Sequence, residues 1–255
     1  MTPLAVVIFA LAGLMIGSFL NVCIYRLPRR ESIVWPASRC TSCNRPLAWF
    51  ENVPVIGWLA LRGRCRTCGS RISPVYPLVE ATSCAVFAGG ALVYGLSPLL
   101  FVRLAFASAL IVLFVIDLQH RILPNVITLP GIAAGFAASL FLPPGWLSSL
   151  IGILAGGGIL FAIAEAYYRL RGIEGLGMGD VKMLAMIGAV LGWPLMLLTL
   201  ILASFAGSLV GVGLMASGRG GMQAALPFGT FLALGALVAA VAGDPILSWY
   251  LAFYR

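Results

Sequence analysis

Two of the three aspartates in the chain stand at the ends of long apolar runs. Asp117 closes the run that precedes LQHRILPN, and Asp180 opens the run that follows GLGMG. An aspartate at the centre of a bilayer costs about 2.5–3.5 kcal/mol, and less near the interface, so a partner or a use must offset that cost. Two carboxylates brought together share a proton, one as acid and one as base, and can activate water against a peptide carbonyl. Asp117 and Asp180 are therefore our candidate catalytic residues.

Each aspartate also has a structural interpretation. An ion pair with Arg121, four residues further on, would suit Asp117, and a cap at a helix N-terminus would suit Asp180. Other hydrolytic chemistries lack their residues. The single histidine, His120, excludes a metalloprotease built on two histidines, and no nucleophile elbow accompanies it. Proteolysis by paired aspartates is the enzyme interpretation that survives.

The glycines before Asp180 favour the catalytic interpretation. Gly175, Gly177 and Gly179 alternate there, a pattern that is unfavourable in a helix and unnecessary for a simple cap. Such a backbone can approach a substrate strand closely or pair with it. We expect Gly177, Gly179 and Lys182 to belong to an active-site loop. For Lys182, the only lysine, contact with lipid phosphate or a structural pair is favoured over tuning of the aspartates.

A second candidate site consists of two Cys-x-x-Cys pairs, CTSC and CRTC, separated by 21 residues. Asn44 and Gly69 directly follow the pairs, and both residue types tolerate the left-handed backbone that such turns need. Four thiolates form a closed, structural Zn²⁺ site. The spacing is slightly longer than usual. Two disulfides or a redox pair are the alternatives, and a cytoplasmic location argues against disulfides. The predicted ligands are Cys40, Cys43, Cys65 and Cys68.

The elements that position these residues are membrane helices. Hydrophobic residues make up 61% of the 255 positions, charged residues 9%, and the mean hydropathy is +1.05. Runs of about 20 apolar residues recur, each long enough to cross a bilayer. The fold class is therefore an all-α polytopic membrane protein with about eight transmembrane helices. The sixth predicted span is short, so we expect a thin or wet environment around it. The predicted spans are about 4–25, 76–96, 98–116, 125–142, 147–168, 181–192, 195–216 and 227–243.

The composition predicts three parts. Residues 1–25 form the first helix, residues 26–75 form a polar module around the cysteines, and residues 76–255 form a membrane domain whose protease core covers about 98–216. Positive residues stay in the cytoplasm, so the arginine-rich module and both aspartates are predicted to face the cytoplasm. The net charge of +8 then reflects topology and attraction to lipid headgroups, and nucleic acid is not expected as a partner. The arginines of the module are Arg26, Arg29, Arg30, Arg39, Arg45, Arg62, Arg64, Arg66 and Arg71.

Five blocks in order resemble the bacterial type IV prepilin peptidases, also called prepilin leader peptidase/N-methyltransferases, which are GxGD membrane aspartyl proteases. The first block is GSFLNVCIYRLPRR (17–30). The second consists of the two Cys-x-x-Cys pairs together with the connecting segment WFENVPVIGWLALRGRC (49–65), which ends at the first cysteine of the second pair. The other three are DLQHRILPN (117–125), GLGMGD (175–180) and LPFGTFLALGA (226–236). The resemblance covers nearly the whole chain.

The resemblance implies a bifunctional enzyme of the bacterial inner membrane. Asp117 and Asp180 would cut the leader from type IV prepilins or type II secretion pseudopilins at the cytoplasmic face. The new N-terminal amine would then be methylated from S-adenosylmethionine, whose binding residues are unknown because no Rossmann-type loop is present. The cysteines match the zinc ligands of the family. Membrane lipid is an expected partner, and a homo-oligomer is left open.

Two other functions are compatible with part of the sequence. One is a prepilin-type peptidase without methyl transfer. The other, from a different class, is an ion-coupled transporter with a zinc-binding regulatory module. Carboxylates at one membrane face, and the lack of an obvious inverted repeat in the sequence, argue against a transporter.

Overall fold

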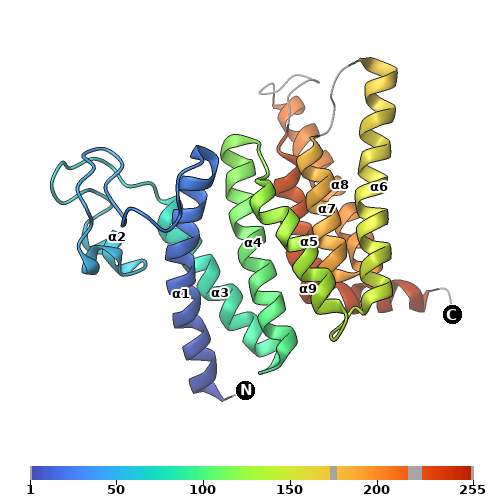
Figure 1. Cartoon of the computed structure of the whole chain (residues 1–255), viewed down its shortest axis with the longest axis horizontal. Coiled ribbons are helices and arrows are strands. Elements are labelled where there is room, and N and C mark those ends of the chain that lie inside the picture. The colour runs from blue at the N-terminus through green and yellow to red at the C-terminus, as the bar shows by residue number, and fades with distance from the viewer. Residues whose placement is uncertain (1, 173–176, 218–225, 254–255) are drawn as a thin grey trace. The chain divides into compact units, whose positions relative to one another are not determined.

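The computed structural model describes residues 2–172, 177–217 and 226–253, and the described chain is helical (Figure 1). No strand occurs in these ranges, which contain only two isolated bridges, Arg39–Pro46 and Arg64–Arg71. Each predicted span has its helix. These helices are α1 (Pro3–Arg26), α3 (Val75–Tyr94), α4 (Pro98–His120), α5 (Asn125–Ser139), α6 (Trp146–Arg171), α7 (Met178–Leu191), α8 (Trp193–Ala216) and α9 (Phe228–Ala252).

Six of the described helices, α1, α3, α4, α6, α8 and α9, are long and apolar enough to cross a membrane. The chain is thus a multi-pass membrane protein, as predicted. The other two are shorter: α5 has 15 residues and α7 has 14. At 1.5 Å per residue α7 is about 21 Å long, less than the hydrocarbon thickness of about 30 Å.

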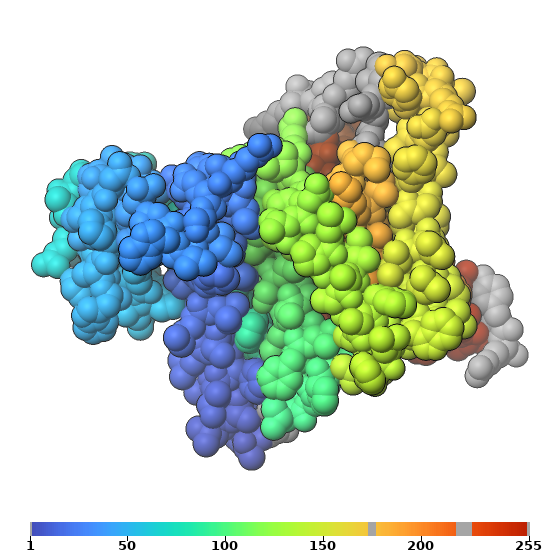
Figure 2. All heavy atoms as spheres, in the orientation of Figure 1, coloured from blue at the N-terminus to red at the C-terminus, as the bar shows by residue number. Residues whose placement is uncertain are grey.

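Helix α7 is enclosed by protein. It packs against α5, α6, α8 and α9, and every residue from Met183 to Leu191 is buried. In Figure 2 the part of α7 in view (orange) lies between α5 and α6. Ser149 of α6 donates its hydroxyl to the carbonyl oxygen of Ala189 at 2.8 Å. We expected a thinned or wet bilayer to accommodate this short helix. Neighbouring helices cover its sides in the described structure, and the thin or wet bilayer stays a prediction.

Packing divides the chain into two compact units, one up to Val112 and one from Leu113 onward, so α4 contributes to both. The boundary follows contacts between helices. The boundaries that we placed at 25/26 and 75/76 follow polarity, and they stay a prediction. Both aspartates lie in the second unit, and the four predicted metal ligands lie in the first.

In the first unit α1 and α3 lie side by side along closely packed backbones (Figure 1). A Cβ atom on Gly17 would lie 2.7 Å from Cα of Glu80, and one on Gly13 would lie 2.6 Å from the carbonyl oxygen of Ser83. Small residues allow such an approach between membrane helices. Asn21 adds a hydrogen bond from its amide to the carbonyl oxygen of Tyr76 at 3.0 Å.

Residues 27–74, between α1 and α3, contain the short helices η1 (Leu27–Arg29), η2 (Trp49–Asn52) and α2 (Ile56–Ala60). Buried charges hold this segment. Arg26 donates to the carbonyl oxygens of Ser32 at 2.8 Å and Pro36 at 2.7 Å. Glu80 of α3, which is 7% exposed, accepts the N–H of Val55 at 2.7 Å.

Val55 has a strained backbone. Its φ of 60° and ψ of −51° form a γ-turn, closed by a 2.6 Å hydrogen bond from Ile56 N–H to the Pro54 carbonyl oxygen. A β-branched residue with positive φ is unusual, and such strain persists only where the surroundings impose it. The Glu80 carboxylate is one of the contacts that do so.

Candidate active site and metal centre

Asp117 lies in the last turn of α4 and is 5% exposed. Its Oδ2 accepts two hydrogen bonds from Thr230, the third residue of α9: one from the backbone N–H at 2.7 Å and one from the hydroxyl at 3.0 Å. The predicted alternative, an ion pair with Arg121, is not among the ion pairs of the described residues, which join Arg39 to Glu31, Arg45 to Glu51 and Arg169 to Glu165. Asp117 thus joins α4 to the start of α9.

Asp180 is the third residue of α7, and Gly177 is the N-cap of that helix. The Asp180 carboxylate interacts with the backbone N–H of Gly177, in the manner of half a capping box. It also lies near enough to Asp117 for the two charges to repel one another. The cap that we considered as an alternative is therefore present, but it places Asp180 beside the other candidate.

Leu123, in the loop after α4, packs against the first turns of both α7 and α9. A Cβ atom on Gly179 would lie 2.9 Å from the Leu123 Cβ, and one on Gly229 would lie 2.9 Å from the Leu123 Cδ1. The same atom on Gly229 would lie 3.0 Å from Oδ2 of Asp117. Two glycines thus let the beginnings of α7 and α9 approach this loop and the Asp117 carboxylate.

The start of α7 corrects one expectation. We expected the backbone from Gly175 to Gly179 to be able to pair with a substrate strand, which requires an extended strand, but Met178 and Gly179 already form the first turn of the helix. Gly177 is extended, with φ −75° and ψ 142°, values open to any residue. Gly175 lies outside the described residues. The strand is therefore wrong at Met178 and Gly179, because the helix begins three residues earlier than hydropathy indicated.

Lys182, in the next turn of α7, donates from Nζ to the Asn125 Oδ1 at 2.9 Å. Asn125 is the first residue of α5, so this hydrogen bond joins the N-termini of two helices. The contact supports the structural interpretation of Lys182.

The four cysteines of the paired Cys-x-x-Cys sequences form one cluster: all of their sulfur atoms lie within 4.8 Å of one another. The Sγ atoms of Cys40 and Cys68 are 3.9 Å apart. Four sulfurs at about 2.3 Å from a central ion would stand about 3.8 Å apart, so this donor set fits a tetrahedral metal. All six cysteines are free, which contradicts the disulfide alternative.

Both turns have the backbone that the sequence predicts. Asn44 has φ 56° and Gly69 has φ 68°, and their N–H groups donate to the carbonyl oxygens of Cys40 and Cys65 at 3.0 Å. Backbone N–H groups of Cys43 and Ser42 lower the pKa of the Cys40 thiol to about 6. Those of Cys68 and Thr67 lower the pKa of Cys65. Because the thiolate is the form that binds metal, the turns prepare both sulfurs for an ion.

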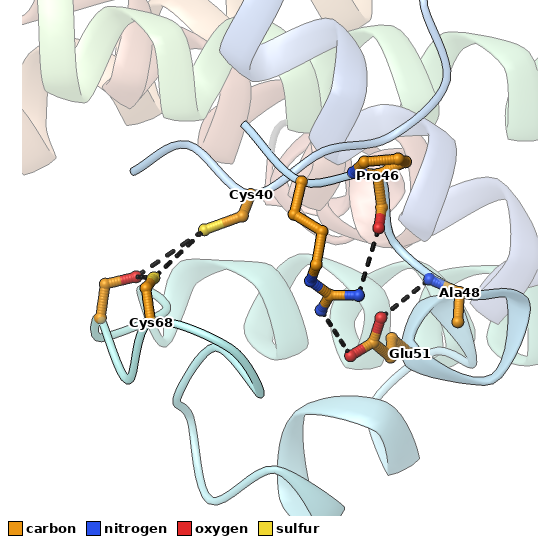
Figure 3. A network of polar contacts seen from close by, with 7 residues as sticks. Cys40, Pro46, Ala48, Glu51 and Cys68 are labelled. Atoms are coloured by element: carbon orange, nitrogen blue, oxygen red, sulfur yellow. Dashed lines mark hydrogen bonds and ion pairs between the residues drawn. The ribbon is translucent and has the colours of Figure 1, made fainter. Parts of the chain in front are cut away.

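The first turn is braced by a buried carboxylate (Figure 3). Glu51, whose side chain is 1% exposed, accepts from the Arg45 guanidinium at 2.8 Å and from the N–H of Ala48 at 2.8 Å. Arg45 also donates to the carbonyl oxygen of Pro46 at 3.2 Å. The hydrogen bond from Arg45 and then that from Ala48 lower the pKa of the Glu51 carboxyl.

Comparisons with known proteins agree over almost the whole chain. Residues 11–94 match the Bacterial Peptidase A24 N-terminal domain, and residues 104–212 match the Type IV leader peptidase family. A protein of Pseudomonas putida is 37% identical over 261 residues, which cover 92% of this chain and 89% of that protein. The chain belongs to the Type IV leader peptidase family.

Other relatives are equally similar. The protein of Burkholderia pseudomallei strain 1026b is 38% identical, covering 91% of this chain and 84% of its own. The protein of Aeromonas salmonicida strain A449 is 36% identical, and the match covers 94% of this chain and 92% of that protein. All three are named prepilin leader peptidase/N-methyltransferase. No solved structure matches the chain significantly.

Two residues of this candidate site were missed by sequence reasoning. Thr230 lies in a block that carried the resemblance, but nothing in the sequence pairs it with an aspartate 113 positions earlier. Leu123 looked like one apolar residue of a loop. The only available signal was glycine at 179 and at 229, beside the helix starts that Leu123 contacts.

Proposed function

We propose that this chain cleaves the leader peptides of type IV prepilins or type II secretion pseudopilins and then methylates the new N-terminal amine. We further propose Asp117 and Asp180 as the catalytic residues of the cleavage. The observation that carries the assignment is that Leu123, in the loop after α4, packs against the first turn of α7, which carries Asp180, and against Gly229, which lies against Oδ2 of Asp117. The charges of the two carboxylates act on one another across this contact. Membership of the family supports both activities.

The surroundings of the two carboxylates suit a shared proton. Two negative charges brought together in a site of low polarity favour loss of one charge, and the retained proton makes one carboxyl an acid beside a base. Asp117 meets the N-terminus of α9 and Asp180 lies in the first turn of α7. Helix N-termini carry partial positive charge, so one negative charge is tolerated there.

The cleavage then needs only these groups and water. The ionised carboxylate takes a proton from water while the oxygen attacks the scissile carbonyl carbon, and the other carboxyl gives its proton to the carbonyl oxygen. When the tetrahedral intermediate collapses, the C–N bond breaks and the amine nitrogen takes up a proton. The products are a leader with a new carboxyl end and a mature protein with a free amine.

For the second activity S-adenosylmethionine would supply the methyl group, and the freed amine would attack it with its lone pair. The names of the relatives support this activity. The methyl-transfer site within this chain is not assigned. A peptidase without methyl transfer is separated from the bifunctional enzyme by a labelled methyl donor and a pre-cleaved substrate.

We also propose that Cys40, Cys43, Cys65 and Cys68 hold a structural Zn²⁺. Four sulfur donors with no open coordination position are typical of structural zinc, and the cluster fits a tetrahedral ion. The segment has little apolar core of its own: several of its largest side chains, including Val34, Trp35, Trp49 and Ile56, are exposed. A metal would therefore supply much of the stability of residues 30–74.

The arginines between α1 and α3 support placement of this segment at the cytoplasmic face of the inner membrane. A prepilin enters the membrane with its basic leader in the cytoplasm, so the cleavage site would lie at the same face. Prepilins are the proposed protein partners, membrane lipid surrounds the helices, and a homo-oligomer is left open.

Cleavage of a prepilin in detergent tests the assignment of the aspartates. Wild type is compared with Asp117→Asn and Asp180→Asn, which keep the shape of the side chain and remove its charge. Asp244→Asn is the matched control, because Asp244 is the third aspartate and is exposed on the second half of α9. We expect both site variants to lose cleavage, with helical content unchanged, and the control to cleave normally. Wild-type cleavage by either site variant would reject the aspartyl mechanism.

A further inference from the structure

The two carboxylates of the proposed dyad are held differently. Asp117 Oδ2 accepts two hydrogen bonds from one residue of another helix, the N–H and the hydroxyl of Thr230. Asp180 interacts with the backbone N–H of Gly177, the N-cap of its own helix. In the described part of the chain, no hydrogen bond from another helix to the Asp180 carboxylate accompanies this contact.

The start of α9 is arranged around the Asp117 carboxylate. The N-cap of α9 is Pro227, which provides no side-chain acceptor for the free N–H groups of the first turn. Asp117, from α4, supplies that acceptor to the N–H of Thr230, the third helical residue. Gly229 lets it come close, since a Cβ atom there would lie 3.0 Å from Oδ2. Asp117 and Thr230 are both 5% exposed, so water competes little for these hydrogen bonds.

Donors that point at a carboxylate oxygen stabilise its charged form. Because the N–H and the hydroxyl of Thr230 both donate to Oδ2, the Oδ1 atom of Asp117 can accept a hydrogen bond from the attacking water. The other charged groups that act on Asp117 are Arg121, on the loop after α4, and Asp180, on α7. The first turn of α9 carries no acidic side chain.

We infer that Thr230 is a positioning residue that holds Oδ2 of Asp117, so that Asp117 is the general base and Asp180 carries the shared proton as general acid. The inference rests on the proposed function. Water gives its proton to Oδ1 of Asp117 as its oxygen bonds to the scissile carbon, and Asp180 protonates the carbonyl oxygen. On collapse Asp180 takes back a proton from one hydroxyl of the diol, the C–N bond breaks, and Asp117 gives its proton to the nitrogen. Both carboxyls then return to their starting states.

The test is the pH dependence of kcat/KM for prepilin cleavage in detergent, measured on the full chain. Such a profile has an acidic limb that follows ionisation of the base and a basic limb that follows deprotonation of the acid. Thr230→Val removes the hydroxyl donor, keeps the N–H and changes the volume little. Thr230→Ser, the matched control, keeps both donors.

We expect Thr230→Val to move the acidic limb up by about one pH unit, because a hydrogen bond to a charged group has about that strength. Thr230→Ser should leave the acidic limb in place, and the basic limb should move little in either variant. Thr230→Ala gives the same comparison if valine disturbs packing, and Thr230→Pro, which the first turn of a helix tolerates, also removes the N–H and should move the limb further.

Three results would overturn the inference. An unchanged acidic limb in both Thr230→Val and Thr230→Ala would show that the hydroxyl does not act on the base. A shift of the basic limb alone would reverse the two roles. A lower unfolding midpoint with both limbs in place would leave Thr230 with a purely structural role. Asp117→Asn keeps the two proposals apart: an inactive Asp117→Asn beside an unmoved limb rejects only this inference, whereas an active one rejects the dyad itself.

Discussion

Gly152 and Gly188 meet where α6 crosses α7, and a Cβ atom on Gly152 would lie 2.5 Å from the carbonyl oxygen of Gly188. Gly156, one turn further along α6, faces the carbonyl oxygen of Leu184 in the same way, at 2.8 Å. Backbone lies against backbone here, so no side chain can rotate away to make room. The crossing fixes α7, the helix that carries Asp180, against α6.

Replacing Gly152 with valine should therefore destabilise the protein. Overpacking typically costs about 1–3 kcal/mol, and a backbone neighbour places this site at the upper end. We expect a lower unfolding midpoint in detergent and reduced cleavage. Gly158→Ala is the matched control, because it lies on the same helix with nothing within 4 Å of the added atom. Its midpoint should stay or rise, since alanine favours a helix over glycine.

The two glycines before Asp180 should differ in their tolerance. Gly179→Ala would bring a Cβ atom 2.9 Å from Cβ of Leu123, which is fixed to its backbone, and the helix start must shift. Gly177→Ala would place the new atom 3.5 Å from Oδ2 of Asp180, an ordinary contact on an ordinary backbone. Cleavage rates in detergent should fall about tenfold or more for Gly179→Ala, the equivalent of about 1.4 kcal/mol. Equal losses in both variants would argue against the Leu123 contact as the cause.

Lys182 should matter to cleavage less than its position suggests. Its Nζ is engaged by Asn125, so Lys182→Met removes a hydrogen bond between two helix starts and leaves both aspartates in place. We expect cleavage within about threefold of wild type and a small loss of stability, of about 0.5–1.5 kcal/mol. Asn125→Leu removes the same hydrogen bond from the other side and should match it. A much larger loss in Lys182→Met alone would connect the lysine charge to the dyad.

Metal content tests the cysteine cluster. We expect one zinc per chain by elemental analysis, and Cys40→Ser or Cys65→Ser should lose it. Removal of the metal by a chelator should expose residues 30–74 to protease, because an ion bound by the four sulfurs would hold the two turns together. Cys23→Ser and Cys84→Ser are the controls, since these residues lie in α1 and α3, outside the cluster. A chain that keeps its zinc after Cys65→Ser would contradict the four-sulfur site.

The Glu51 carboxylate should make the stability of residues 30–74 depend on pH. Its pKa is lowered by the hydrogen bonds from Arg45 and Ala48, so the charged form is favoured in the folded state. A carboxyl with a lowered pKa contributes stability above its unfolded value, about 4.3, and this contribution is lost as the pH falls through the folded value. At pH 7 the Glu51→Gln variant should therefore be less stable to limited proteolysis of residues 30–74 than wild type. Below about pH 4 the difference should shrink, and a constant difference would exclude the charge as its cause.

The bounds of the helices could be predicted from sequence to within a few residues wherever an apolar run ends at a charged residue or a turn. The last helix is an exception: we ended it at 243, before Asp244 and Pro245, but α9 continues to Ala252 with Pro245 inside it. Proline removes one hydrogen bond of the helix, and apolar residues after it carry the helix on. The cysteine cluster could be predicted because its geometry is local, two turns of the same pattern.

The details of the proposed active site were less accessible. Thr230 reaches Asp117 only through the packing of α9 on the end of α4, and hydropathy contains no information on that packing. The contact of Lys182 with Asn125 depends in the same way on how α5 and α7 meet. Spacing therefore predicted the candidate residues, and tertiary structure decided which donors surround them.

The turn at Val55 bears on the order in which the protein is made. Its N–H is held by Glu80, which the ribosome adds 25 residues later. When residues 53–57 are synthesised, the carboxylate that favours their strained turn does not yet exist. The cysteine segment can thus take up its final form only after α3 has been synthesised and has paired with α1. Biogenesis of this region should then wait for the second membrane helix, and a chain truncated before Glu80 should leave the segment open.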